Sequence, residues 1–483
     1  MKSKNIHLLI AAILAVALYF ILSQPVCLDM GLTTIGASTL AIFIATIYLW
    51  ITYGTGWISL LSIGLLGFTG IAPANTILAN SFGNSTTVIV IGTLMLCVAL
   101  EETGVAKLIA NWFISRKFVE NRPYMFFAMF FLAALIVAWF VTGTPVAVIF
   151  VTLGLSVMES IGYGRGDKFS MALIMGTIFV IVCGMAATPI GHPIVLTVLT
   201  AMTNIAGEPV SWTKYMMIGI PFSIIGYLLV LAIIKFLVRP DCSKFVNYSV
   251  EDIKKDMVPL DARGKIISVI YVLLIIWWLF PDTFGTFFPT IKAFIKSGGE
   301  ALPCIIAAAI ACGISVGGKP VLGYKHALSK ISWPLVYFIA TIFLYAAVLR
   351  LETGGINVFL SSLVSPITSA VSPFVMVAIF LGLVTLLTNF ISNAVTGAIG
   401  VTICVPLLAA NPATAPWCAA FAVLVAILCN YGVMTPGGSG FVAIALDGDY
   451  VQPGDMVKYG LILCILTFLV ALAFWPLCLM ILA

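Results

Sequence analysis

The chain has 483 residues, of which 62% are hydrophobic and only 8% are charged, and its net charge is +5. About a quarter of the residues of a soluble domain are charged. This composition therefore excludes a water-soluble fold and predicts that most of the chain lies in lipid. The small positive charge fits cytoplasmic loops and does not indicate nucleic-acid binding. The 11 cysteines form no Cys-x-x-Cys pair, and we interpret them as small buried hydrophobes.

Apolar blocks in the first half predict membrane spans and shorter helices, since one span takes about 20 residues. We interpret the first block as a retained helix and not as a cleaved leader, because residues 24–27 form a poor cleavage site. A short tip at 142–145 and a break at 187–192 each divide a pair of blocks. The predicted blocks are 6–23, 37–53, 57–72, 86–101, 103–116, 123–141, 145–160, 168–184, 193–205 and 214–237.

A long polar loop at 239–265 separates the two halves of the chain. Together with Lys2 and Lys4 it is predicted to be cytoplasmic, because positive charge gathers on that side of the membrane. The second half contains a second tip at 392–394 and a second break at 431–438. Its predicted blocks are 264–280, 301–318, 333–350, 354–365, 371–391, 395–409, 416–430, 439–447 and 456–482.

The two halves repeat one another. The Glu-Thr-Gly at 102–104 recurs 250 positions later, and so does the hydroxyl residue of the first tip. The Thr-Pro at 188–189 recurs 247 positions later. Because the segment order is also the same, the pattern predicts an inverted repeat, which is typical of secondary transporters.

Interrupted helices within apolar sequence are informative, because irregular backbone at membrane depth is tolerated only where it is buried in protein or lines a wet cavity. Each interruption leaves free helix ends. The N–H groups of a helix start favour an anion, and the carbonyl groups of a helix end favour a cation such as sodium. An ordinary capped turn would explain one interruption, but matched tips paired with matched breaks predict a binding site for a small solute.

The tips carry small polar side chains in turn positions. Thr144 is a predicted N-cap and Pro145 a predicted first residue of the returning helix in the first half. In the second half Ser392 and Asn393 supply a hydroxyl and an amide, and Thr388 lies one turn earlier. These groups are candidate ligands for an anion or a cation.

Charged and titratable residues near the breaks are few. His192 is predicted either to contact substrate or to form a hydrogen-bonded helix cap. Glu101, Glu102 and Glu352 are interpreted as interfacial caps or salt-bridge partners, and Arg350 is expected to pair with Glu352 or Glu102. No HExxH, nucleophile-elbow or Walker A motif occurs, which argues against an enzyme or an ATP-driven pump.

Several segments together resemble the divalent anion/sodium symporter family within the ion transporter superfamily, from about residue 40 to the end. They are Phe-Gly-Asn-Ser-Thr at 82–86, Glu-Thr-Gly at 102–104, Ala-Thr-Pro-Ile-Gly at 187–191 and the paired tips. The resemblance implies an all-α polytopic membrane protein, an inverted repeat of about eleven spans with two re-entrant hairpins and two broken helices. It also implies a homodimer, an elevator motion, no catalytic residues, and no cofactor other than sodium as the coupling ion.

The resemblance further implies a scaffold part and a moving transport part in each repeat. The implied divisions are 1–117 (scaffold, first repeat), 118–213 (transport, with hairpin 123–160 and broken helix 168–205), 214–263 (linking span and loop), 264–366 (scaffold, second repeat) and 367–483 (transport, with hairpin 371–409, broken helix 416–447 and last span 456–482).

The site residues that the resemblance implies lie in the tips and breaks. The implied substrate contacts are Thr142, Gly143, Thr144, Ser392, Asn393, Ala394, Thr188, Pro189, His192, Thr435 and Pro436. The implied sodium ligands are Thr388, Asn393, Thr142 and Gly191. Gly143 and Ala394 replace the family's usual Asn and Thr, and Ala138 replaces a polar residue whose counterpart, Thr388, is kept. The second-half ion site therefore looks better preserved.

These observations predict a secondary transporter of small di- or tricarboxylate anions, coupled to sodium, in the inner membrane as a multi-pass protein. Its implied partners are the anion, the lipid bilayer and a second copy of the chain. The alternatives are a sodium-independent anion exchanger, a transporter of another anion such as sulfate, a sodium/proton antiporter or arsenite permease, and a channel. The absence of Asp from the middle of any predicted span argues against proton antiport.

Overall fold

The computed structural model of the chain describes residues 2–207, 209–255, 259–360, 362–363 and 372–482. Within these ranges it is a bundle of helices with one two-residue antiparallel ladder, β1 (Ser315–Val316) with β2 (Lys319–Pro320). The prediction of an all-α polytopic fold is confirmed.

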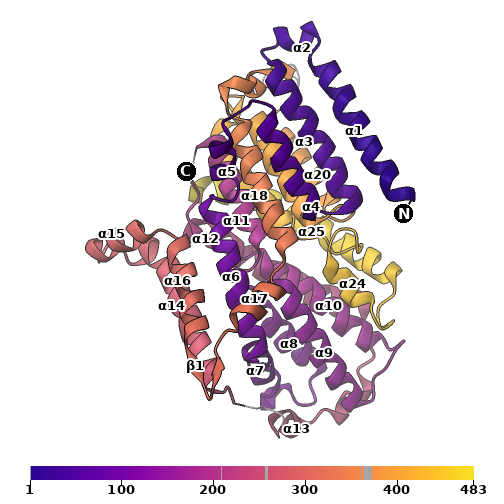
Figure 1. Cartoon of the computed structure of the whole chain (residues 1–483). Coiled ribbons are helices and arrows are strands. Elements are labelled where there is room, and N and C mark those ends of the chain that lie inside the picture. Colours follow the sequence, from indigo (N-terminus) through magenta and orange to yellow (C-terminus); the bar gives the residue numbers. More distant parts are fainter. Residues whose placement is uncertain (1, 208, 256–258, 361, 364–371, 483) are drawn as a thin grey trace.

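The first half contains long helices separated by short connections (Figure 1). In chain order the helices are α1 (Lys2–Leu22), α2 (Pro25–Asp29), α3 (Thr34–Tyr53), α4 (Gly56–Phe68), α5 (Ala74–Asn80), α6 (Ser85–Glu102), α7 (Val105–Ile114), η1 (Lys117–Val119), α8 (Pro123–Ala138), α9 (Gly143–Ile161), α10 (Lys168–Met185), α11 (Pro193–Ala206), α12 (Trp212–Ala232), η2 (Ile233–Val238), η3 (Ser243–Asn247) and α13 (Val250–Lys255).

In both halves a hairpin is followed by an interrupted helix and then by a long helix. These are α8–α9, α10–α11 and α12 in the first half, and α20–α22, α23–α24 and α25 in the second half. Its helices are α14 (Ala262–Thr283), α15 (Pro289–Gly298), α16 (Ala301–Gly313), α17 (Tyr324–Lys330), α18 (Trp333–Val348), η4 (Glu352–Gly354), α20 (Pro373–Leu387), α21 (Asn393–Ile399), the π-helix η5 (Gly400–Cys404), α22 (Val405–Ala409), η6 (Ala415–Trp417), α23 (Cys418–Leu428), α24 (Gly440–Leu446) and α25 (Pro453–Leu482).

Seven helices of the described residues are long and apolar enough to cross a bilayer. The pairs α15–α16 and α17–α18 are bent by 76° and 68°, and they raise the number to nine if each pair forms one span. Shorter apolar helices, among them α8, α11 and α20, supply the tips and breaks. The expected total of about eleven spans stays a prediction.

The structure differs from the predicted blocks mainly between α14 and α18. The block predicted at 301–318 ends at Gly313, because Gly317 and Gly318 have positive φ angles and turn the chain into the β1–β2 hairpin. The short helices α5, α15 and α17 were not predicted. The predicted boundary at 366/367 lies outside the described residues.

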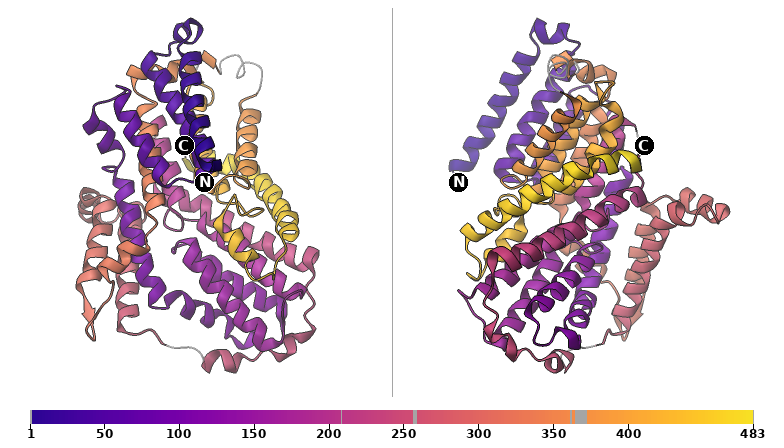
Figure 2. Two further views of the ribbon diagram at one scale, coloured as in Figure 1. Left: turned by 45° about the vertical axis from the view of Figure 1, so that its right-hand side comes forward. Right: turned by 180° about the vertical axis from the view of Figure 1, so that it is seen from behind.

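The core is formed by aromatic and aliphatic side chains of α8, α10 and their neighbours. Phe126, Phe127, Phe130 and Phe169 are fully buried and contact one another through their rings. The helices α12 and α25 lie side by side and run obliquely across the molecule (Figure 2). The α14–α16 segment stands apart from this core, with α15 projecting outward (Figure 1).

Candidate functional site

The first tip joins α8 to α9 near the centre of the bundle. α9 begins at Gly143, with Thr142 as its extended N-cap residue and no hydrogen bond from the Thr142 side chain to the helix. The prediction that Thr144 caps the helix and Pro145 begins it is therefore wrong by two residues. Proline still fits, because residues in the first turn of a helix have no intrahelical partner for their N–H groups.

A threonine in each break holds the neighbouring tip. The Thr188 hydroxyl donates to the carbonyl oxygen of Trp139, and the Thr435 hydroxyl donates to that of Asn389. Each hydroxyl oxygen also accepts a hydrogen bond from a glycine N–H of its own break. The Gly191 N–H donates to Thr188 at 3.1 Å, and the Gly438 N–H donates to Thr435 at 3.4 Å. The same contact thus recurs at repeat-related positions, and both hydroxyls serve to position the backbone.

Two glycines allow the backbone of each break to approach its tip. A Cβ atom on Gly191 would lie 2.5 Å from the Ala138 carbonyl oxygen. A Cβ atom on Gly438 would lie closer than 3.0 Å to the Thr388 carbonyl oxygen. Only glycine permits such close approach without displacing the backbone. The carbonyl groups that end the first helix of each hairpin therefore face the interrupted helix.

Oxygen atoms converge at the second tip. The Thr388 hydroxyl donates to Asn393 Oδ1 at 3.0 Å, and Asn393 Nδ2 donates to the Asn430 carbonyl at 3.3 Å. A Cβ atom on Gly432 would lie 2.6 Å from the Thr388 carbonyl oxygen and closer still to Asn393 Oδ1. The buried Oδ1 of Asn430 has no hydrogen-bond partner within the described part of the chain. These groups are neutral oxygen donors of the kind that bind sodium in transporters.

Asn389 is a site residue that the sequence did not reveal. Its Oδ1 accepts the backbone N–H groups of Val433 and Met434, both at 3.0 Å, and its Nδ2 donates to Thr385 at 2.9 Å. The side chain thus fixes the unwound backbone of the second break against α20. An amide within an otherwise apolar helix was the available signal. In the first half Trp139 stands at this position.

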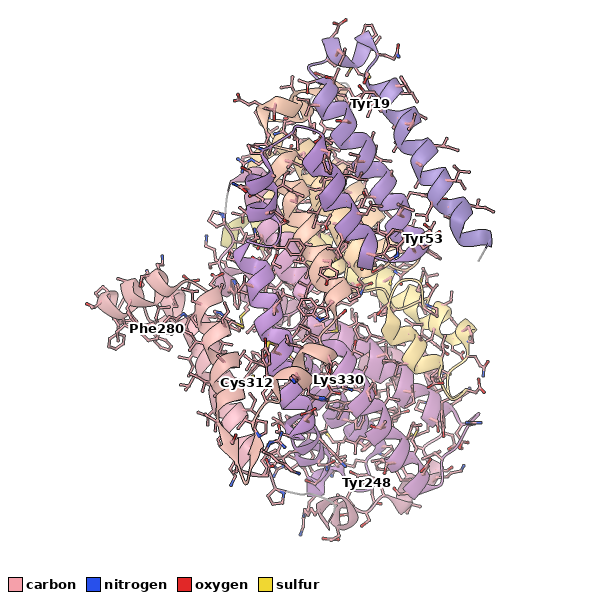
Figure 3. The ribbon with its side chains drawn as sticks, in the orientation of Figure 1. Tyr19, Tyr53, Tyr248, Phe280, Cys312 and Lys330 are labelled. Carbon is pink, nitrogen blue, oxygen red and sulfur yellow. The ribbon has the colours of Figure 1, made fainter. Side chains whose placement is uncertain are left out.

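A cavity of about 370 Å³ lies beside the first tip. It combines the start of α9 and the start of α11 with residues of α6, α17 and α18. Figure 3 labels Lys330 at the end of α17, a helix that packs against α6. The cavity is lined by Leu94, Cys97, Val98, Glu101, Thr142, Gly143, Thr144, Pro145, Val148, His192, Pro193, Lys330, Ile331, Ser332, Leu335 and Phe441.

The cavity contains only part of the set expected from sequence. The first-tip residues and His192 line it together. The second-tip residues and the two Thr-Pro pairs are not among its lining residues, and their role in binding substrate stays a prediction. Lys330 was not predicted, because a lysine in a short polar connection resembles an ordinary cytoplasmic charge.

His192 occupies the N-cap position of α11, but its side chain makes no capping hydrogen bond. Its Nδ1 is buried and has no partner among the residues that the structure describes. The alternative of a hydrogen-bonded helix cap is therefore wrong. His192 lines the cavity, and its contact with substrate stays a prediction.

Two predicted ion-pair partners are arranged differently from the expectation. Glu102 forms an ion pair with His326 of α17. Arg350 donates a hydrogen bond to the carbonyl oxygen of Asn204 and does not pair with Glu102. The Glu102 pair links α6 to α17, so the interpretation of this glutamate as a salt-bridge partner is confirmed.

The described residues contain no group of three or more His, Cys, Asp or Glu side chains that could hold a metal ion. The oxygens that converge at the second tip belong to carbonyl, hydroxyl and amide groups. Such ligands suit hard cations and do not suit transition metals.

Matched helix interruptions inside an apolar helix bundle, beside a cavity, are features of membrane transporters. The family described as the sodium:sulfate symporter transmembrane region matches residues 2–482, and the chain belongs to this family. The expected membership in the divalent anion/sodium symporters and the expected multi-pass membrane location are confirmed.

Two relatives extend this comparison. The sodium-dependent dicarboxylate transporter SdcS of Staphylococcus saprophyticus is 24% identical over 298 residues, covering 58% of this chain and 55% of SdcS. The chain thus spans about half the length of the curated relative it matches. The crystal structure of the YdaH transporter of Alcanivorax borkumensis has a TM-score of 0.53 and 16% identity, covering 83% of this chain and 87% of that one. This similarity shows the fold alone.

Proposed function

We propose that the chain is a secondary active transporter of small di- or tricarboxylate anions, driven by sodium through an elevator motion. The observation that carries the proposal is the meeting of two helix starts, those of α9 and α11, at one cavity whose lining includes hydroxyl groups and a lysine. The name of the relative SdcS supports dicarboxylate as the substrate class and sodium as the coupling ion.

The cavity has the groups that an anion requires. The starts of α9 and α11 line the cavity with the positive ends of two helix dipoles. Thr142 and Thr144 add hydroxyl groups, and Lys330 adds a positive charge. Glu101 lines the same cavity on the α6 side, and its carboxylate would oppose the attraction of an anion to Lys330.

The second tip supplies the cation site in this proposal. Sodium would be held by Asn393 and by the carbonyl of Thr388, close to Gly432. Helix-end carbonyls and unwound backbone are the groups with which transporters bind such ions near the middle of the membrane. Thr142 and Gly191 were the corresponding candidates in the first half.

The elevator motion follows the implied division of the chain. The transport parts, 118–213 and 367–483, would slide past the scaffold parts, 1–117 and 264–366, with 214–263 as the linker. The Tyr271 hydroxyl donates to the Phe140 carbonyl oxygen, and this hydrogen bond crosses the implied boundary. A homodimer joined through the scaffold parts belongs to the same proposal.

The decisive experiment is uptake of labelled succinate into proteoliposomes, with external sodium and internal unlabelled dicarboxylate varied independently. Uptake into empty vesicles that follows the sodium gradient would support symport. Uptake that requires internal dicarboxylate and ignores sodium would replace symport by exchange. Competition by sulfate or citrate in the same assay would rank the anions.

The second candidate function is a sodium-independent anion exchanger. The first half favours it, because Ala138 and Gly143 bring no side-chain oxygen to the first tip. A channel would show neither saturation nor stimulation by substrate on the opposite side, so the same vesicles separate it from both transporters.

A further inference from the structure

We propose that the chain has a single sodium site, at the second tip, and that the Met185 thioether closes the equivalent place at the first tip. The inference rests on the proposed sodium coupling and adds its stoichiometry. It arises from a comparison of the two halves, residue by residue, where tip and break meet.

The backbone is alike in both halves. Each break donates a threonine hydroxyl to a tip carbonyl, and each places a glycine against the carbonyl that ends the first hairpin helix. Gly191 faces Ala138 in the same way as Gly438 faces Thr388. A difference in cation binding therefore has to come from the side chains.

The two halves differ in which of two equivalent positions carries the larger side chain, the tip or the break. In the second half Asn393 brings its Oδ1 next to Gly432, where no side chain competes for the space. In the first half the tip residue is Gly143 and the break carries Met185 at the position that corresponds to Gly432. A Cβ atom on Gly143 would lie closer than 3.0 Å to Met185 Sδ and 2.8 Å from the ring of Phe441.

Where the second half has the amide oxygen of Asn393, the first half has the thioether sulfur of Met185. Sodium is a hard cation and prefers oxygen ligands, whereas a thioether is a soft ligand. Ala138 also lacks the hydroxyl that Thr388 directs at the second tip. The first half thus keeps the backbone of a cation site, but Ala138 and Gly143, the counterparts of Thr388 and Asn393, provide no side-chain oxygen, and the Met185 thioether lies beside Gly143.

The unaltered protein provides the first test. Succinate uptake is measured against sodium concentration in proteoliposomes, and binding of radioactive sodium to the purified protein is measured in parallel. We expect a Hill coefficient of about 1, because this coefficient cannot exceed the number of coupled sites, and saturation at one sodium per chain. A coefficient of about 2, or binding of two ions, would overturn the inference while leaving the proposed function intact.

A pair of substitutions tests the role of Met185. Gly143→Asn together with Met185→Gly gives the first half the amide oxygen and the open glycine of the second, while Ala138 and Phe441 stay unchanged. We expect this double variant to bind a second sodium, and the Hill coefficient to rise toward about 2. Met185→Gly alone is the matched control, since it opens the space without adding an oxygen, and should still bind one ion.

The remaining outcomes are also decisive. A folded double variant that binds one sodium would overturn the role of Met185. If the double variant does not fold, the stoichiometry of the unaltered protein still decides the number of sites. Uptake that ignores sodium, with no sodium bound, would overturn both this inference and the proposed coupling.

Discussion

Gly432 has almost no free space around its Cα atom, because Asn393 Oδ1 and the Thr388 carbonyl oxygen both point at it. In Gly432→Ala the new methyl group would push these oxygens apart at a cost of about 1–3 kcal/mol. We expect the sodium concentration for half-maximal uptake to rise about tenfold, which corresponds to about 1.4 kcal/mol. Sodium-dependent succinate uptake measures this change.

Gly440→Ala is the control for this substitution. Gly440 belongs to the first turn of α24. A Cβ atom there would have no atom of the residues that the structure describes within 4 Å. Its uptake should match that of the unaltered protein. An equal loss in both variants would contradict the assignment of the second tip, since it would mean that the segment tolerates no added methyl group.

The sequence identifies polar residues in the tips, and it does not reveal their long-range partners. Thr388 and Asn393 are conspicuous within apolar sequence, and their small polar side chains suggest ligands. Asn389 lies in the same stretch, but its partners are backbone N–H groups 44 and 45 positions away, and no local pattern reveals such a contact. Met185 resembles any other apolar residue until its sulfur is found beside Gly143.

At the scale of elements, the two hydroxyl contacts that tie each break to its tip should stabilise the fold. We expect Thr188→Val and Thr435→Val each to destabilise the protein by about 0.5–1.5 kcal/mol, because a buried carbonyl loses its donor while the side-chain shape is nearly kept. Thermal unfolding of the purified protein in detergent checks this expectation.

Thr396→Val is the matched control for these two variants. The Thr396 side chain is buried in α21, and its hydroxyl has no partner among residues placed by the structure. Its replacement should leave the melting temperature unchanged or raise it slightly. Similar decreases in melting temperature in all three variants would mean that the hydrogen bonds of Thr188 and Thr435 do not stabilise the fold.

Most long helices could be predicted from apolar block length, and α8, α10, α11 and α25 lie within a few residues of the expected ranges. The tips and breaks were also found, because glycine, proline and hydroxyl residues interrupt the apolar pattern there. The pattern failed for α15, which is short and carries lysines among its apolar residues, and for the β1–β2 turn. Hydropathy reports neither the amphipathic pattern of a short helix nor the backbone angles of the two glycines that form the turn.

At the scale of the whole molecule, the Tyr271–Phe140 hydrogen bond should favour the conformation of this structure over the other positions of the transport parts in the proposed elevator motion. Tyr271→Phe would remove about 1 kcal/mol of stabilisation and shift the population away from this conformation about fivefold. We expect faster hydrogen exchange at residues 140–145, measured by mass spectrometry. Tyr248→Phe, which removes a similar hydrogen bond to the Ile114 carbonyl, should leave this exchange unchanged.

If exchange at the first tip were the same in both tyrosine variants, the implied boundary between scaffold and transport parts would not run between α14 and α8. The fold class is already evident from composition. The division into parts is not, because it depends on which of many apolar contacts break during transport.

A single sodium site, with Met185 in place of the second, determines the net charge that moves with each anion. One sodium entering with a dianion moves one net negative charge, and a membrane potential does about 2.3 kcal/mol of work on each charge per 100 mV. An inside-negative potential would therefore oppose uptake, and we expect the current carried by succinate uptake to have the sign of anion entry. Exchange of one dianion for another, each with one sodium, would be electrically silent. Membrane voltage would thus favour exchange over net accumulation.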